Sequence, residues 1–478
     1  MTKKLIINAT KMITPGHLAF GLWRLSDPVA PQYTELRYWT ELACLLEDGG
    51  FDSLFLADAL GQLDSYRGSA DPALVTATQT PLDDPLLVVP AMATVTRTLG
   101  FGVTVSTTYE QPYLLARKFT TLDHLTSGRI GWNIVTSQLD SAARNLGYDR
   151  QVPHDERYEI AQEFLEVTCK LWEGSWDAGA VVRDRLNGVY ADPGRVHAIG
   201  HSGKYFSVPS AHLSEPSVQR TPLIFQAGTS PRGKLFAARN AEVVFVTGFS
   251  PRTLKRNIDE IKSLAAGFGR APGSIKFITS AVVITGKTDS AADRKLREYQ
   301  KWYSVEGALT HFSSVTGIDW SSCDLDAPLS YLETDSNRSI LASLTKNAPA
   351  GEEWTLRKFI APKDGISYGG ISIIGDGEAA ASSLEALAEE AGLDGFNLAA
   401  AHSHESFADL AEHVMPVLAR RGRLREKIPG RSLREATFDG GSALLPADHP
   451  ASAYRNAFQD EPSSAPPLPE CAATPSGA

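Results

Sequence analysis

The sequence has few cysteines, no long apolar run and no excess of positive charge. Its 478 residues include four cysteines, at positions 44, 169, 323 and 471, and no two of them form a CxxC pair. This spacing argues against a disulfide framework and against a zinc site. The longest apolar stretch, near residues 86–95, is far shorter than the roughly 20 residues that a membrane helix needs. The N-terminus also lacks the apolar core of a signal peptide, so we expect a cytoplasmic protein with no membrane partner.

The charge balance narrows the class of partner. The formal net charge is -10 and the isoelectric point about 5.6. Nucleic acids and anionic membranes attract clustered lysine and arginine, so the sequence predicts no nucleic-acid partner and a small-molecule substrate. His197 and His201 have the i,i+4 spacing of metal ligands, but no matching Glu, Asp or Cys accompanies them. We therefore predict no metal site.

Strand and helix patterns alternate along the chain. Short apolar runs rich in β-branched residues predict strands, and helical spacing of apolar residues follows most of them. The predicted strands are 5–7, 51–57, 99–105, 130–135, 222–227, 243–247, 275–284 and 395–399. Eight such units predict an α/β fold of the (β/α)₈ TIM-barrel type, with a doubly wound sheet as the competing fold.

Two segments interrupt this alternation and one follows it. Residues 173–221 and 304–375 are long insertions after strands four and seven, and connections of this length are usually lids or binding loops. Beyond residue 438 the chain is rich in Pro, Ala, Ser and Gly. We therefore predict one domain over residues 1–438 and a disordered tail over 439–478.

Polar residues stand where the predicted strands end. Asn133, Thr136 and Ser137 close the fourth strand, and ligands of parallel α/β proteins bind at the carboxyl ends of strands. The next helix carries His154 and Tyr158 on one face, because they are four residues apart. After strand five, the amides and the hydroxyl of residues 227–230 open a helix, which is the geometry of an anion site and makes Ser230 the strongest candidate for a phosphate ligand.

Several sequence blocks together resemble one enzyme family. They are GLWR, TTYEQPY, ARKFTTLDHLTSGRIGWNIVTS, HDERY, LIFQAGTSPRG, LDGFNLA and VMPVLARRGRLR. The chain resembles the bacterial luciferase-like flavin monooxygenases, in the branch that oxidises nitrilotriacetate, EDTA, dibenzothiophene sulfone and long-chain alkanes. The resemblance implies a TIM barrel and a two-component enzyme without a metal. Such enzymes take reduced FMN (FMNH2) from a separate NAD(P)H-dependent reductase, form a C4a-(hydro)peroxyflavin with O2 and insert one oxygen atom into an organic substrate.

The resemblance also implies roles for single residues. It places flavin contacts at Asp58 and Ser106, the side chain of His154 beside the flavin, and the hydroxyl of Tyr158 near the FMN phosphate. Ser137 lies in a block that resembles the family's strand-four block, and we predict that it also binds the cofactor. Thr229 and Ser230 are the predicted ligands of the anion site described above. The simpler alternatives are that Asp58 forms a salt bridge or a cap and that His154 caps its helix.

The remaining predictions concern the substrate pocket. His311 lies in the second insertion, where it is either an acid/base group or an ordinary lid histidine. Phe20 and Phe55, with Trp23, are predicted to form an apolar pocket wall that excludes water. Because a buried carboxylate without a matched cation is costly, we expect a largely apolar substrate with one oxidisable centre and no polycarboxylate.

Two other functions remain open at this stage. One is a deazaflavin-dependent oxidoreductase of the same superfamily, and the other is a non-catalytic flavin-binding protein. We also expect a homo-oligomer, either a dimer or a tetramer.

Overall fold

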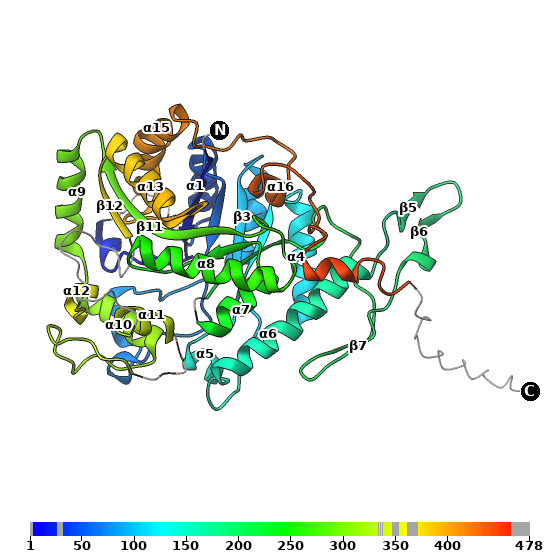
Figure 1. Ribbon diagram of the computed structural model, residues 1–478, viewed down its shortest axis with the longest axis horizontal. Coiled ribbons are helices and arrows are strands. Elements are labelled where there is room, and N and C mark those ends of the chain that lie inside the picture. The colour runs from blue at the N-terminus through cyan, green and yellow to red at the C-terminus, as the bar shows by residue number, and fades with distance from the viewer. Residues whose placement is uncertain are drawn as a thin grey trace, which may run out of the picture.

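A closed parallel barrel forms the centre of the molecule (Figure 1). The computed structural model describes residues 3–25, 32–228, 230–332, 334, 336, 338–346, 353–360 and 371–459. Eight strands pair in parallel around the barrel, and the contact between β10 and β11 closes it. This confirms the predicted TIM barrel. In chain order the strands are β1 (Ile6–Lys11), β2 (Ser53–Leu56), β3 (Gly100–Ser106), β4 (Ile130–Val135), β9 (Leu223–Ala227), β10 (Val243–Phe245), β11 (Lys276–Gly286) and β13 (Gly395–Ala399).

The barrel interior is filled by aromatic rings that face small residues. The ring of Phe55 lies 4.5 Å from that of Phe245 and 5.8 Å from that of Phe225, measured between centroids. Gly102 and Gly131 leave room for these rings, because a Cβ atom at either position would lie within 3 Å of a phenylalanine ring carbon. Large and small residues thus interdigitate on facing strands, as close packing requires.

Helices cover the outside of the barrel, and amphipathic sequences explain why they form there. Most of their apolar faces join the main core, whereas their outer faces carry charged residues. The longer barrel helices are α1 (Leu36–Asp48), α4 (Pro112–Leu125), α6 (His154–Cys169), α7 (Pro231–Asn240), α8 (Pro251–Gly267), α9 (Asp289–Trp302) and α13 (Gly377–Ala391). Shorter ones are α2 (Asp71–Thr76), α3 (Val89–Thr94), α5 (Asp140–Asn145), α14 (Ser403–Asp409), α15 (Met415–Arg420) and α16 (Leu433–Thr437). Among the described residues, no helix is long and apolar enough to cross a membrane.

The first insertion forms an arm that projects from the barrel. Its hairpin of β5 (Val181–Asp184) and β6 (Val189–Ala191) stands away from the body at the right of Figure 1. A second short hairpin, β7 (His201–Ser202) with β8 (Ser207–Val208), lies closer to the body.

The second insertion contains helices α10 (Val305–Thr316), α11 (Arg338–Leu344) and α12 (Leu356–Ile360), which lie together at the lower left of Figure 1. They share an apolar core that includes Phe312, Trp320 and Phe359 and is separate from the main core. Phe20, from the first loop of the barrel, also belongs to this second core.

Three details differ from the sequence predictions. Strand β12 (Ile371–Asp376) lies at the end of the predicted insertion and pairs with the second half of β11, outside the closed barrel. Residues 85–96, whose apolar spacing predicts one helix, are divided into a 3₁₀ turn (Pro85–Leu87) and α3, because Pro90 cannot donate a hydrogen bond to the preceding turn. The predicted disordered tail begins too early, since the chain between 439 and 459 is packed against the barrel and buries Leu445, His449 and Phe458. Residues 460–478 lie outside the described residues.

Candidate functional site

Hydroxyl groups meet at the carboxyl ends of β3 and β4. The Oγ atoms of Ser106 and Ser137 are 2.7 Å apart, and the backbone N–H of Thr108 donates to Ser106 Oγ over 3.2 Å. Ser137 has a φ of 55°, a left-handed conformation that a non-glycine residue adopts at some cost in energy. The two predicted serines are therefore brought together at the barrel mouth, and the backbone turn at Ser137 fixes the direction of its side chain.

Asp58 lies two residues beyond the end of β2 and is partly buried. Burial raises the pKa of Asp58 to about 6, the Asp84 carboxylate adds to the shift, and the N–H of Ala59 opposes it. A carboxyl group with this pKa is mostly ionised at pH 7 and becomes a hydrogen-bond donor in mild acid. The Asp58 carboxyl group can therefore accept or donate a hydrogen bond at the polar edge of a bound ring.

The start of α7 forms a cradle with the hydroxyl group of Tyr158. Ser230 is the N-cap of α7, and its Oγ accepts a hydrogen bond from Gly233 N–H over 3.0 Å. The Tyr158 side chain interacts with Ser230, and a Cβ atom added at Gly233 or Gly228 would lie 2.8 or 3.1 Å from the Tyr158 hydroxyl oxygen. Two glycines, a helix N-terminus and two hydroxyl groups therefore converge on one small space, and this donor set suits a phosphate.

The neighbours of this cradle were also predicted. His154 is the first residue of α6, and its ring centroid lies 5.3 Å from that of Tyr158. Its Nδ1 lies 2.7 Å from Asp155 Oδ1, which orients the ring. Burial raises the pKa of Tyr158, so its hydroxyl group is protonated at neutral pH and can donate to an anion. Thr229 lies outside the described residues.

The predicted pocket wall is divided between two places. Phe20 packs against His311 of α10, with 5.3 Å between ring centroids, whereas Phe55 belongs to the apolar cluster inside the barrel. His311 is buried, and its burial lowers its pKa to about 4, so the imidazole is neutral at pH 7. The Trp23 indole is 42% exposed and donates from Nε1 to the Thr76 carbonyl oxygen over 3.1 Å. Phe20 and Phe55 therefore do not form one continuous wall.

A family model described as luciferase-like monooxygenase matches residues 18–339. The chain belongs to this luciferase-like monooxygenase family. It is 48% identical over 459 residues to the long-chain alkane monooxygenase of Geobacillus thermodenitrificans, covering 95% of this chain and 99% of that protein. It is 45% identical over 460 residues to the dimethyl-sulfide monooxygenase of Hyphomicrobium sulfonivorans, covering 96% of this chain and 95% of that protein.

Solved structures of this family have the same fold. The Hyphomicrobium sulfonivorans protein superposes with a TM-score of 0.87 over 95% of this chain and 97% of its own. A riboflavin lyase, solved with a modified FMN and riboflavin, is 34% identical and superposes with a TM-score of 0.87 over 95% of this chain and 100% of its own. The F420-dependent tetrahydromethanopterin reductase of Methanopyrus kandleri, at 14% identity and a TM-score of 0.53, covers 87% of this chain and 99% of its own and shares the fold alone.

Two residues at the barrel mouth of this luciferase-like monooxygenase were not predicted as site residues. Lys11 ends β1, and His17 follows in the next loop. The first strand was predicted to end at residue 7, because the polar Asn8 and Thr10 interrupt its apolar pattern. In the barrel these two side chains are buried, so β1 continues to Lys11.

Proposed function

We propose that this protein is an FMNH2-dependent monooxygenase that inserts one oxygen atom from O2 into a small organic substrate. The cradle at the start of α7 is the observation that carries the proposal. Tyr158 and Ser230 would donate hydrogen bonds to the FMN phosphate, and Gly228 and Gly233 keep the space open that a side chain would fill. Thr229 is proposed to belong to the same site.

The ring system of FMN would then extend toward the ends of β2, β3 and β4. Asp58, Ser106 and Ser137 stand there with polar groups that suit the nitrogen and oxygen atoms of the ring edge. The side chain of His154 would lie beside the flavin. Reduced FMN, when bound, activates O2 for transfer of one oxygen atom, and the protein's tasks are orientation and exclusion of water.

Helix α10 would exclude water from the mouth of the barrel. Its residues from Gly307 to Thr316 are buried, and the N–H of Ser304 donates to the Phe20 carbonyl oxygen over 2.9 Å. Arg67, from the loop after β2, pairs with Glu306 at 2.8 Å. The neutral imidazole of His311 would face the reacting atoms as a hydrogen-bonding group, because a neutral ring offers one N–H donor and one nitrogen acceptor.

Substitution Gly307→Val is expected to uncouple the reaction. The added Cβ atom would lie 2.7 Å from Thr78 Oγ1 and 3.1 Å from Phe20 Cβ, so α10 has to move away from the barrel mouth. We expect release of hydrogen peroxide per NADH to rise several-fold and product to fall, with unchanged binding of reduced FMN. Gly267→Val is the control, because nothing lies within 4 Å of a Cβ atom at the end of α8. Equal coupling in both variants would show that α10 does not shield the site.

A binding titration followed by a turnover assay distinguishes the proposed function from two others. A deazaflavin-dependent oxidoreductase would bind a reduced deazaflavin cofactor and transfer a hydride, and a flavin-binding protein would bind without turnover. The purified protein should be titrated anaerobically with reduced FMN and with the reduced deazaflavin. It should then be supplied with an FMN reductase, NADH and O2 and tested with alkyl sulfides and alkanes. Tight binding of reduced FMN together with oxygenated product supports our proposal, whereas preference for the deazaflavin contradicts it.

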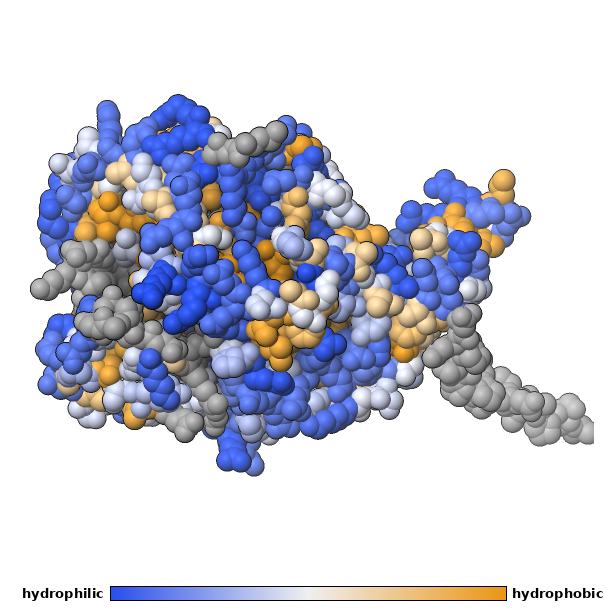
Figure 2. Space-filling model, in the orientation of Figure 1, coloured by the Kyte–Doolittle hydropathy of each residue, from blue (hydrophilic) through white to orange (hydrophobic). Residues whose placement is uncertain are grey.

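We also propose that the protein is a homo-oligomer that assembles through its projecting arm. Leu186 is 98% exposed and Tyr190 60% exposed on the β5–β6 hairpin, and Figure 2 shows apolar residues on this arm. An isolated two-stranded hairpin is only marginally stable, so burial against another surface would stabilise it. Residues 177–202 carry three aspartates and three arginines, whereas the whole chain has a net charge of -10. A second copy therefore meets little electrostatic repulsion at the arm.

Leu186→Asp is expected to reduce the assembly to a smaller species, because it places a charge in the interface between arms. Light scattering after size-exclusion chromatography would give the mass of each form. Leu87→Asp, at a side chain that is 78% exposed on the body, is the matched control and should leave the mass unchanged. A monomeric wild-type protein, or a Leu186→Asp variant of wild-type mass, would contradict this assembly.

A further inference from the structure

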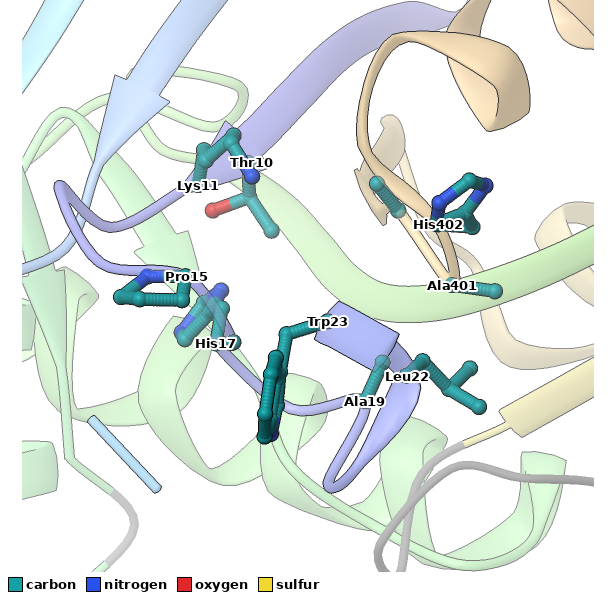
Figure 3. A pocket seen from close by; sticks show the side chains of 11 residues that line it. Thr10, Lys11, Pro15, His17, Ala19, Leu22, Trp23, Ala401 and His402 are labelled. Carbon is teal, nitrogen blue, oxygen red and sulfur yellow. The ribbon is translucent and has the colours of Figure 1, made fainter. Parts of the chain in front are cut away.

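A polar pocket opens beside the candidate flavin site, where β1 and β13 end. Figure 3 shows side chains of the first loop and of the loop before α14 around it. Ala19, Leu22 and Trp23 supply apolar surface on one side. Lys11, His17 and His402 supply nitrogen atoms on the other sides. No described carboxylate lines this pocket.

The Lys11 side chain is unusual in its surroundings. It is 6% exposed, and within the described residues its ammonium group makes neither an ion pair nor a hydrogen bond. Its nearest described interaction is with the ring of Tyr38, 5.6 Å from the ammonium nitrogen to the ring centroid. A cation over an aromatic ring gains only about 0.5–2 kcal/mol, and the Lys11 side chain lines the pocket, where its charge faces no described carboxylate. An anion in the pocket would supply the missing interaction.

Two histidines extend this polar wall. Lys11 acts electrostatically on His17 and helps to lower its pKa to about 3, after the larger effect of burial, so the two groups are close together. His402 Nδ1 lies 2.8 Å from Glu405 Oε2, which orients its ring. The other ring nitrogen, Nε2, is buried without a hydrogen-bond partner among the described residues. With the ring proton on Nδ1, facing the glutamate, Nε2 is a hydrogen-bond acceptor, so Lys11 supplies the positive charge of this pocket.

We propose that this pocket binds the single carboxylate of a substrate whose remainder is apolar. This inference rests on the proposed monooxygenase function and narrows its substrate class. The Lys11 ammonium group would pair with the carboxylate, and Leu22 and Trp23 would contact the hydrocarbon part. Lys11 is the only described side chain of this pocket that is a lysine or arginine. A second carboxylate would therefore be buried without a matched cation, which disfavours polycarboxylates.

The position of the pocket fits this task. His17 interacts electrostatically with His311 of α10, and Phe20 packs against the same histidine. The pocket therefore lies near the region that α10 covers. A molecule anchored at Lys11 would extend its apolar part toward the proposed flavin ring.

Binding of octanoate and of 1-octanol to the purified protein tests the inference, because the two probes share a chain and differ in charge. Isothermal titration calorimetry without flavin should show octanoate binding at least tenfold more tightly than 1-octanol. Lys11→Met should remove this difference and leave 1-octanol binding unchanged, whereas Lys11→Arg should keep it. Lys255→Met, at an exposed lysine of α8, is the control and should behave as wild type.

Equal binding of both probes by the wild-type protein, or an octanoate preference that survives in Lys11→Met, would overturn the proposal. Circular dichroism and the affinity for reduced FMN verify that each variant is folded. Because the probes are bound and not oxidised, the result is independent of turnover. A negative oxygenation assay would therefore not contradict the carboxylate site. An absence of octanoate preference would not contradict the monooxygenase function.

Discussion

Replacing Ser230 with alanine is expected to weaken the binding of reduced FMN at least tenfold, and Tyr158→Phe should have a similar effect. Each substitution removes one hydroxyl group from the cradle in front of α7, where Ser230 caps the helix and Tyr158 faces Gly228 and Gly233. A hydrogen bond to a charged group contributes about 1.5–3 kcal/mol, which corresponds to roughly ten- to hundredfold in affinity. Anaerobic titration with reduced FMN measures the change.

The chain offers a matched control for the loss of a helix cap. Ser250 begins α8 as Ser230 begins α7, each followed by Pro and Arg, and its Oγ accepts from Thr253 N–H over 3.3 Å. Ser250→Ala should lower the free energy of unfolding by about 1 kcal/mol, as the loss of an N-cap does, and leave flavin affinity unchanged. If Ser230→Ala and Tyr158→Phe both bind FMN as the wild type does, the phosphate binds elsewhere.

Glu242→Gln is expected to lower the free energy of unfolding by about 3–5 kcal/mol. Glu242 and Arg434 are both almost completely buried and form a two-pronged ion pair, with Nε–Oε1 at 2.6 Å and Nη2–Oε2 at 2.9 Å. Arg434 also donates to the Thr221 carbonyl oxygen over 2.9 Å. Loss of one charge leaves the guanidinium group buried without its counterion. Adjacent Leu433 belongs to the apolar cluster inside the barrel, so a shift of α16 would also disturb the packing of the barrel interior.

Urea unfolding at pH 7 would measure this loss. The control is Arg420→Met, which breaks an exposed pair with Glu378, and exposed pairs contribute about 0–1 kcal/mol. A loss below 1 kcal/mol in Glu242→Gln would show that α16 is not fastened to the barrel through this pair.

The barrel could be predicted because its strands are buried on both sides. Continuous apolar runs such as 130–135 leave little choice between strand and loop, and parallel pairing follows from the helices between them. The ends of β3, β4 and β9 were placed correctly, so Ser106, Ser137 and Ser230 were assigned to the barrel mouth. Their neighbourhood in space follows directly from the parallel arrangement of these strands.

The sequence was less informative where tertiary contacts outweigh local pattern. Asn8 and Thr10 are buried by neighbouring strands, which no local pattern indicates, and Lys11 was consequently missed. Residues 439–459 are poor in large apolar side chains, yet a few of them, including Phe458, fill gaps on the barrel surface. Phe20 and Phe55, with Trp23, were predicted to form one apolar pocket wall that excludes water. Phe20 instead packs in the separate apolar core of the second insertion.

Transfer of labelled oxygen tests the central proposal most directly. The protein should be supplied with an FMN reductase, NADH and ¹⁸O₂, together with an alkyl sulfide or alkane that it turns over, and the product analysed by mass spectrometry. A monooxygenase places one ¹⁸O atom in each product molecule and none when unlabelled O2 is used in H₂¹⁸O. Product that carries oxygen from water, or a product formed at the same rate without O2, would contradict a monooxygenase.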